Sequence, residues 1–216
     1  TGECAMVKNI NDLNSIHIDV LKEIGNIGAG NAATALAKLL NRRIDMDVPR
    51  VKIMEFRDVS ETLGGAELPV VGIMLKVTGD FTGNILFILK QQAAEILVNM
   101  LMGRPAGDSG AAEGHVFDEI EISALKEIGN ILAGSYLSSL SALTNLNIAP
   151  SVPDLAIDMA GAILSVPAIE FGKVGDSVLY IETEFTEGDK RVVGDFFLVP
   201  DVDTYSVLMN ALGVSF

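Results

Sequence analysis

Two pairs of polar residues in this sequence have side chains and a spacing that could orient a water molecule and bind a charged group of a partner. Glu23 is followed three residues later by Asn26, and Glu127 is followed in the same way by Asn130. An asparagine carboxamide both donates and accepts hydrogen bonds, so it can orient a water molecule, although it has no useful pKa as a base. A carboxylate one turn away can pair with a cation of a partner. Neither group breaks a bond alone, so we expect the metal ion and the activated substrate to come from elsewhere.

Both pairs lie in a string that the chain carries twice. Residues 21–30 read LKEIGNIGAG and residues 125–134 read LKEIGNILAG, 104 positions apart. Between 18–49 and 122–153, 16 of 32 positions are identical at that offset. A repeat near half the chain length indicates a duplicated unit. Equivalent packing explains repeated apolar residues, but the repeated Glu and Asn need another reason.

Helical geometry places the polar residues of each string on one face. We call these faces the first stripe, with Asp19, Glu23 and Asn26, and the second stripe, with Ser123, Glu127 and Asn130. At about 100° per residue, each stripe is roughly 60° wide, and the apolar residues fall on the opposite side. We therefore expect both stripes to face solvent.

Glycines inside the two predicted helices indicate close approach by another group. Each glycine is less favourable there than alanine by about 0.8–1 kcal/mol. Gly30 and Gly134 continue the two stripes, so we expect a partner molecule to come close to them. At Gly25 and Gly129, packing of one helix on the other is an equally good interpretation.

The elements that must position the stripes follow one another in the same order in each half. We expect helices at 16–41, 91–102, 117–146 and 202–212, and strands at 48–57, 70–79, 83–90, 155–165, 176–185 and 192–199. Alternating apolar residues and short connections favour antiparallel pairing. The predicted fold class is α+β, an internal duplication of an α-β-β-β-α unit with pseudo-two-fold symmetry. One joint, mostly antiparallel sheet is packed with the long helices.

The boundaries within this arrangement follow from glycines and a capping pattern. We expect a single domain over 1–216, made of repeats at about 14–103 and 115–213 that a glycine-rich linker at 103–114 joins. Asp118 and Glu121 have the spacing of a capping box at the start of the second long helix.

Composition excludes several classes of function. The net charge of −14 argues against binding to nucleic acid, whose phosphates would be repelled. No apolar run approaches about 18 residues, so no membrane span is expected. The single cysteine, Cys4, rules out an internal disulfide and is typical of a reducing cytoplasm. The missing initiating methionine suggests that residues 1–5 are not native.

Other catalytic sets and metal sites are not indicated by the sequence. Two histidines are too few and too scattered for a zinc site, and no phosphate-binding loop or nucleophile elbow occurs. Two acidic pairs, Asp45 with Asp47 and Asp201 with Asp203, fit solvated turns better than a divalent-ion site.

The two stripes, each with a distant proline, resemble the paired signature of the CheC family of chemotaxis phosphatases. The matching patterns are Asp19-x3-Glu23-x2-Asn26-x22-Pro49 and Ser123-x3-Glu127-x2-Asn130-x22-Pro153. The resemblance covers essentially the whole chain. The related CheX proteins carry one motif per chain, so two motifs favour a CheC-like protein.

The resemblance implies a phosphatase that acts on the response regulator CheY, whose aspartyl phosphate lies beside its own Mg²⁺. By this likeness Asn26 and Asn130 hold a water molecule in line with phosphorus, while Glu23 and Glu127 pair with the active-site lysine of the receiver. Positioning and electrostatics carry most phosphoryl-transfer catalysis. The protein would then need no cofactor of its own, since the receiver supplies Mg²⁺.

The other motif residues are Asp19, Ser123 and the two prolines. Asp19 and Ser123 either contact the partner or only shape the helix surface. Pro49 and Pro153 fit better as structural residues that fix the chain where it enters the first strand of each repeat.

Two alternatives come from other classes of protein. A pure adaptor would bind the phosphorylated receiver, or the receptor deamidase CheD, without hydrolysis. A duplicated structural protein would carry a Glu/Asn stripe that is merely packed or solvated. Phosphate release from a phosphorylated receiver distinguishes the enzyme from both.

Overall fold

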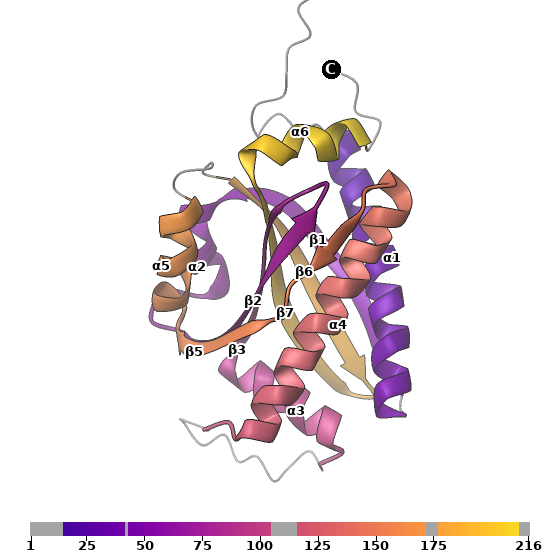
Figure 1. Cartoon of the computed structure of the whole chain (residues 1–216). Coiled ribbons are helices and arrows are strands. Elements are labelled where there is room, and N and C mark those ends of the chain that lie inside the picture. Colours follow the sequence, from indigo (N-terminus) through magenta and orange to yellow (C-terminus); the bar gives the residue numbers. More distant parts are fainter. Residues whose placement is uncertain (1–14, 42, 105–115, 172–176, 212–216) are drawn as a thin grey trace, which may run out of the picture.

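The computed structural model of this protein describes residues 15–41, 43–104, 116–171 and 177–211 (Figure 1). Most of the expected linker at 103–114 lies outside these ranges, as do residues 1–5 and the end of the second predicted repeat. The boundaries of the two repeats therefore stay predictions. None of the helices in the described part of the chain is long and apolar enough to cross a membrane.

Seven strands of the described chain form one antiparallel sheet. Their order is β1, β6, β7, β3, β2 and β4, and β5 also pairs with β2. The strands are β1 Asp45–Glu55, β2 Pro69–Gly79, β3 Gly83–Lys90, β4 Ile148–Pro150, β5 Asp154–Met159, β6 Ser177–Glu187 and β7 Lys190–Pro200.

The two halves of the chain exchange their first strands. Strand β1 of the first half pairs with β6 of the second, and β5 of the second half pairs with β2 of the first. The β2–β3 and β6–β7 hairpins meet at the centre, where β3 pairs with β7. The order of strands is thus equivalent from either edge, as pseudo-two-fold symmetry requires, and neither half has a sheet of its own.

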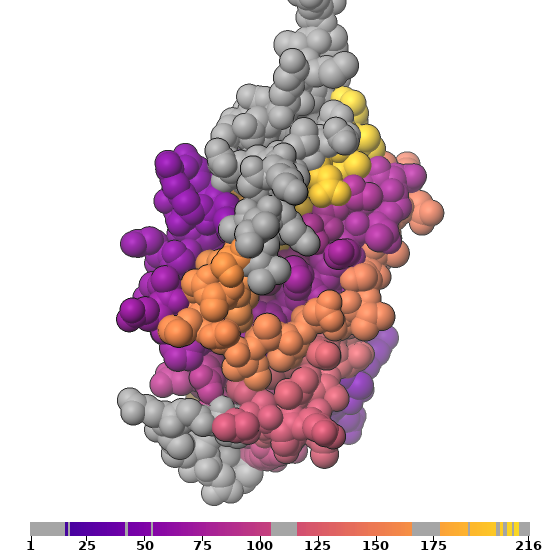
Figure 2. Space-filling view, turned by 60° about the vertical axis from the view of Figure 1, so that its left-hand side comes forward, coloured from indigo at the N-terminus to yellow at the C-terminus, as the bar shows by residue number. Residues whose placement is uncertain are grey.

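Helices cover both faces of this sheet. They are α1 Ser15–Leu40, α2 Val59–Leu63, α3 Gln91–Met102, α4 Glu119–Thr144, α5 Ala160–Phe171 and α6 Val202–Ala211, with a 3₁₀ turn at Phe56–Asp58. Buried side chains of α1, α3, α4 and α6 belong to the core on one face, and those of α2 and α5 belong to the core on the other. Figure 1 shows α1 and α4 on one side of the sheet and α2 and α5 on the other. Figure 2 shows α5 and β5 in orange on the surface of the second face. The α+β class with a mostly antiparallel sheet is confirmed.

Side chains alternate along each strand and so contribute in turn to the cores on the two faces of the sheet. In β2, Val71 and Ile73 are buried under the long helices, whereas Val70 is buried with α2 and α5. Successive side chains of a strand point to opposite faces, so this nearly continuous apolar strand is buried on both sides. The sheet therefore holds α1 and α4 on a rigid base.

One predicted element is wrong in its second half. The strand expected at 155–165 ends at Met159, and α5 begins at Ala160. The backbone N–H groups of Ala160 and Gly161 donate to the carbonyls of Leu68 and Ala66, which turns the chain away from the sheet. A short apolar run does not distinguish a buried strand from a buried helix. The small helix α2 and strand β4 were likewise not expected, while the other bounds agree to within three residues.

The ends of the long helices account for one of the polar identities in the repeat. Asn41 and Asn145 follow α1 and α4 with left-handed φ values of 50° and 56°, a conformation that asparagine tolerates at a helix end. At the other end of α4, Asp118 and Glu121 form the predicted capping box. Gly103, at φ 67°, ends α3 as a left-handed C-cap.

Candidate functional site

Helices α1 and α4 lie side by side on one face of the sheet and run in opposite directions (Figure 1). The amide of Asn31 donates to Ser139 Oγ across the pair at 3.2 Å. Gly28 lies directly against the ring and backbone of Tyr136, so the absence of a side chain allows this contact. The two helices thereby form one surface that carries both stripes.

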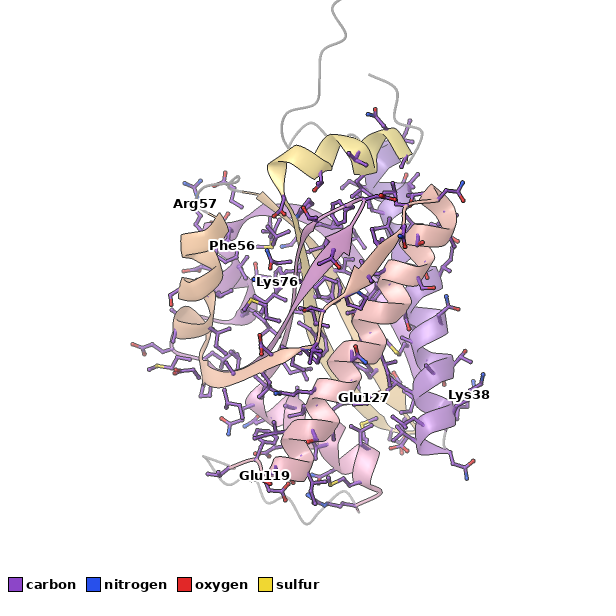
Figure 3. All side chains as sticks on the ribbon, in the orientation of Figure 1. Lys38, Phe56, Arg57, Lys76, Glu119 and Glu127 are labelled. Atoms are coloured by element: carbon purple, nitrogen blue, oxygen red, sulfur yellow. The ribbon has the colours of Figure 1, made fainter. Side chains whose placement is uncertain are left out.

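Both stripes are exposed, as the helical periodicity predicted. Glu23 and Asn26 of the first stripe and Glu127 and Asn130 of the second are all solvent-exposed. The apolar residues of the same turns are buried against the sheet: Leu21, Ile24, Leu125 and Ile128. Figure 3 shows Glu127 on α4, well away from the ends of this helix. Asp19 and Ser123, one turn earlier, are exposed as well.

The glycines of the repeat divide into two groups by their surroundings. A Cβ atom added at Gly30 or Gly134 would have no neighbouring atom within 4 Å, so nothing inside the described chain requires glycine there. At Gly129 an added Cβ would lie 2.6 Å from Cγ2 of Ile73, and at Gly25 it would lie 3.5 Å from Cγ1 of Val48. Gly25 and Gly129 therefore pack on the sheet, not on the other helix, which corrects the helix-on-helix interpretation.

The two motif prolines interrupt edge strands below the helices. Pro49 lies inside β1, at the register shift between Asp47 and Arg50, and Pro153 lies between β4 and β5. Proline has no N–H group for a strand ladder and is tolerated on edge strands or at bulges. Pro49 thus lies inside its strand, which corrects the expectation that it marks the entrance, whereas Pro153 directly precedes β5, as expected.

A buried tyrosine fixes α4 to the sheet beneath the stripes. The Tyr136 hydroxyl lies 3.0 Å from Thr183 Oγ1 of β6, and its ring centroid is 4.7 Å from that of Phe196 in β7. Burial raises the pKa of Tyr136 to about 12, against a smaller lowering by the hydrogen bond to Thr183. Tyr136 stays neutral at physiological pH and serves packing.

A polar cluster that sequence reasoning missed lies on the opposite face of the sheet. The Tyr180 hydroxyl donates to Asp195 Oδ1 at 2.7 Å and to Glu182 at 3.2 Å, and Lys52 Nζ is 5.2 Å from the ring centre. Burial raises the pKa of the Asp195 carboxyl, and the hydrogen bond from Tyr180 opposes this change. The four residues come from three strands with no sequence spacing in common, so no local signal predicts the cluster.

The acidic pairs considered for a metal ion have other surroundings. Asp45 and Asp47 lie in strand β1, not in a turn, and Asp45 pairs with Arg43 at 3.2 Å. Asp201 accepts a hydrogen bond from Thr82 at 2.6 Å. The side chain of Asp203 lies outside the described part of the chain.

The Glu and Asn side chains of both stripes are exposed on the surface of α1 and α4. A cavity of about 240 Å³ lies between β2, β5 and α5, on the other side of the sheet, and its lining includes Met74, Asp158 and Ile163 but no stripe residue. An exposed helix surface suits contact with a macromolecule better than enclosure of a small molecule.

Comparison with known proteins identifies the class to which this duplicated α+β fold and its two stripes belong. The sequence model of the CheC-like family matches residues 16–53 and 120–157, which contain both stripes and both motif prolines. A crystal structure of Thermotoga maritima FliY aligns with a TM-score of 0.73 and 26% identity, over 95% of this chain and 100% of that chain. The fold and the site thus define a chemotaxis-type protein with an internal repeat.

Two relatives narrow the class further. CheY-P phosphatase CheC of Bacillus subtilis (strain 168) is 41% identical over 207 residues, which are 95% of this chain and 98% of that protein. Flagellar motor switch phosphatase FliY of the same organism is 32% identical over 68% of this chain but only 37% of its own length. This chain belongs to the CheC-like family.

Proposed function

We propose that this protein is a phosphatase that removes the phosphoryl group from the aspartate of a CheY-type response regulator. The observation that carries the proposal is the presence of two equivalent, solvent-exposed Glu/Asn stripes in a chain that aligns end to end with a CheY-P phosphatase. A helix surface of this kind can enter the site of a receiver, because the Glu and Asn side chains of both stripes are exposed in the described part of the chain.

The asparagines are proposed to orient the attacking water. Asn26 and Asn130 are exposed and fixed on helices that the sheet supports. A carboxamide donates to one group and accepts from another, so it can hold a water molecule in line with phosphorus. A water molecule that is held in this way has already lost its translational and rotational entropy before the reaction, so this loss no longer adds to the barrier.

The glutamates are proposed to anchor the receiver. Glu23 and Glu127 lie three residues before the asparagines and are exposed as well. A hydrogen bond between two charged groups contributes about 1.5–3 kcal/mol, so an ion pair with the active-site lysine of the receiver would both bind and align the partner.

The metal ion and the reactive bond belong to the substrate in this proposal. Mg²⁺ and the aspartyl phosphate come with the receiver, since a carboxylate and an amide do not activate a phosphoryl group alone. We place the reaction in the cytoplasm, where the receiver acts. The deamidase CheD is proposed as a second partner, and an adaptor without hydrolysis would bind either protein.

A substrate comparison tests the proposal. The protein should release phosphate over many turnovers from a phosphorylated receiver with Mg²⁺, and should not hydrolyse p-nitrophenyl phosphate with any added metal ion. The Asn26→Ala, Asn130→Ala double variant should bind the phosphorylated receiver without releasing phosphate. Asn210→Ala on α6, which changes another exposed helical asparagine, is the matched control and should remain active.

Two results would contradict the proposal in different ways. Binding of the phosphorylated receiver by the unaltered protein without turnover would support the adaptor. Hydrolysis of the small ester with added metal would show that the chain has a metal site of its own.

A further inference from the structure

One repeated polar residue has no role in the site as described so far. Besides the Glu and Asn of the stripes, the identities between the two long helices include Lys22 with Lys126 and Asn41 with Asn145. The two asparagines are explained by their left-handed backbone at the helix ends. The lysines are left without a structural reason.

Helix geometry places each lysine beside the asparagine of its own stripe. Lys22 precedes Asn26 by four residues, and Lys126 precedes Asn130 in the same way, so each pair lies on one face about 6 Å apart along the axis. On the first helix the directions of Lys22, Asn26 and Glu23 are about −60°, −20° and 40°. The asparagine therefore lies between a cation on one side and an anion on the other.

The lysines make no ion pair with the residues that the structure describes. Among the described ion pairs, every cation is an arginine. Lys22 is exposed and Lys126 is half-buried. Asp19, three residues before Lys22, is a possible partner by spacing, but Ser123 stands at the equivalent place before Lys126. Pairing with a stripe carboxylate at that place therefore cannot explain why both copies carry lysine.

The charge balance of the site favours an anionic ligand for these lysines. The chain has a net charge of −14, and each stripe presents a glutamate, so a phosphoryl group would approach a negative surface. An ammonium group on a flexible stem is a common phosphate ligand. In each copy this lysine is a cation directly beside the asparagine of the stripe.

We propose that Lys22 and Lys126 bind the phosphoryl oxygens of the receiver, each beside the asparagine that orients the water. The proposal rests on the phosphatase function above and adds a further substrate-contacting residue to each stripe. The glutamate then engages the receiver lysine on one side of the asparagine, and the stripe lysine engages the phosphoryl group on the other. Charge on the phosphoryl oxygens in the transition state would be balanced in part by this ammonium group.

The test compares charge-removing and charge-keeping variants of the full chain. Lys22→Met with Lys126→Met keeps most of the stem but removes both charges, and Lys22→Arg with Lys126→Arg keeps them. Lys38→Met is the matched control, because Lys38 is exposed on the same helix about 18 Å beyond Asn26. Figure 3 shows Lys38 projecting outward near the end of α1.

Binding to two forms of the receiver separates a phosphoryl contact from general attraction. One form carries beryllofluoride and Mg²⁺ on its aspartate, and the other carries Mg²⁺ alone. The Met variant should lose about ten- to a hundred-fold in affinity for the beryllofluoride form and little for the other, with a similar fall in phosphate release. The Arg variant should recover most of the preference for the beryllofluoride form over the form with Mg²⁺ alone. Lys38→Met should match the unaltered protein.

Each contrary outcome has a distinct meaning. Equal losses for both receiver forms, with a strong salt dependence, would show that the lysines attract the acidic surface of the receiver and would overturn the proposal. Unchanged affinity and turnover in the Met variant would overturn it too, while the phosphatase function stood. If the unaltered protein released no phosphate, the phosphatase function itself would fail.

Discussion

Substitution of Gly30 by alanine should make the protein more stable and less active. A Cβ at this position meets no atom within 4 Å, and the Gly30 carbonyl that accepts from Thr34 Oγ1 at 2.9 Å is retained. Alanine is favoured over glycine in a helix interior by about 0.8–1 kcal/mol. For a domain of this size, that gain corresponds to a rise in Tm of about 2–4 °C.

The loss of activity follows if a partner approaches the helix at the bare backbone. A methyl group added to a packed contact is unfavourable by about 1–3 kcal/mol, so receiver affinity should fall by about five- to a hundred-fold. The measurement needs the first stripe alone, so Gly30→Ala is combined with Asn130→Ala and compared with Asn130→Ala in steady-state phosphate release. Urea unfolding of the same two proteins gives the change in stability.

Gly28→Ala is the contrasting control on the same helix. Its Cβ would lie 3.0 Å from the Cα of Tyr136, an atom that cannot move without α4. The higher helix propensity of alanine stabilises the protein and the overpacking destabilises it, so we expect a net loss of up to about 2 kcal/mol in the free energy of unfolding. Folded protein should keep its receiver affinity, because this position faces away from the stripe. Unchanged receiver affinity in the Gly30→Ala protein would refute close approach there, and a loss of stability would refute open space around the added methyl.

Three further predictions concern the stripes and the packing below them. Asn26→Ala should leave the second site working and Asn130→Ala the first, so loss of all phosphate release in either single variant would refute two independent sites. Glu23→Gln with Glu127→Gln should weaken receiver binding about ten- to a hundred-fold; added salt should weaken the unaltered protein more, and equal salt dependence would exclude the ion pair. Burial raises the pKa of Tyr136 from 10.0 to about 12, so the unfolded chain loses this proton at lower pH than the folded one. This contribution to the free energy of unfolding is complete below pH 10 and is lost by about pH 12, and it amounts to about 2–3 kcal/mol. In urea unfolding from pH 8 to 12, the free energy of unfolding of Tyr136→Phe should therefore fall less steeply than that of the unaltered protein. Identical slopes would contradict this assignment.

The sequence by itself determined the features that depend on neighbours within a few turns. The 3.6-residue period of α1 and α4 separates the exposed Glu23 and Asn26 from the buried Leu21 and Ile24, because a helix fixes direction from spacing alone. The capping box at Asp118 is local in the same sense. The repeat also predicted that the two stripes have the same role.

The tertiary structure alone decided what depends on residues about a hundred positions apart. The exchange of β1 and β5 between the halves, the turn into α5 at Ala160 and the packing of Gly129 on Ile73 rest on distant partners. Short apolar segments fit a strand or a helix equally well until such partners satisfy their backbone groups. For the same reason the sequence predicted that the stripes are exposed, while only the packed sheet placed both of them on one surface.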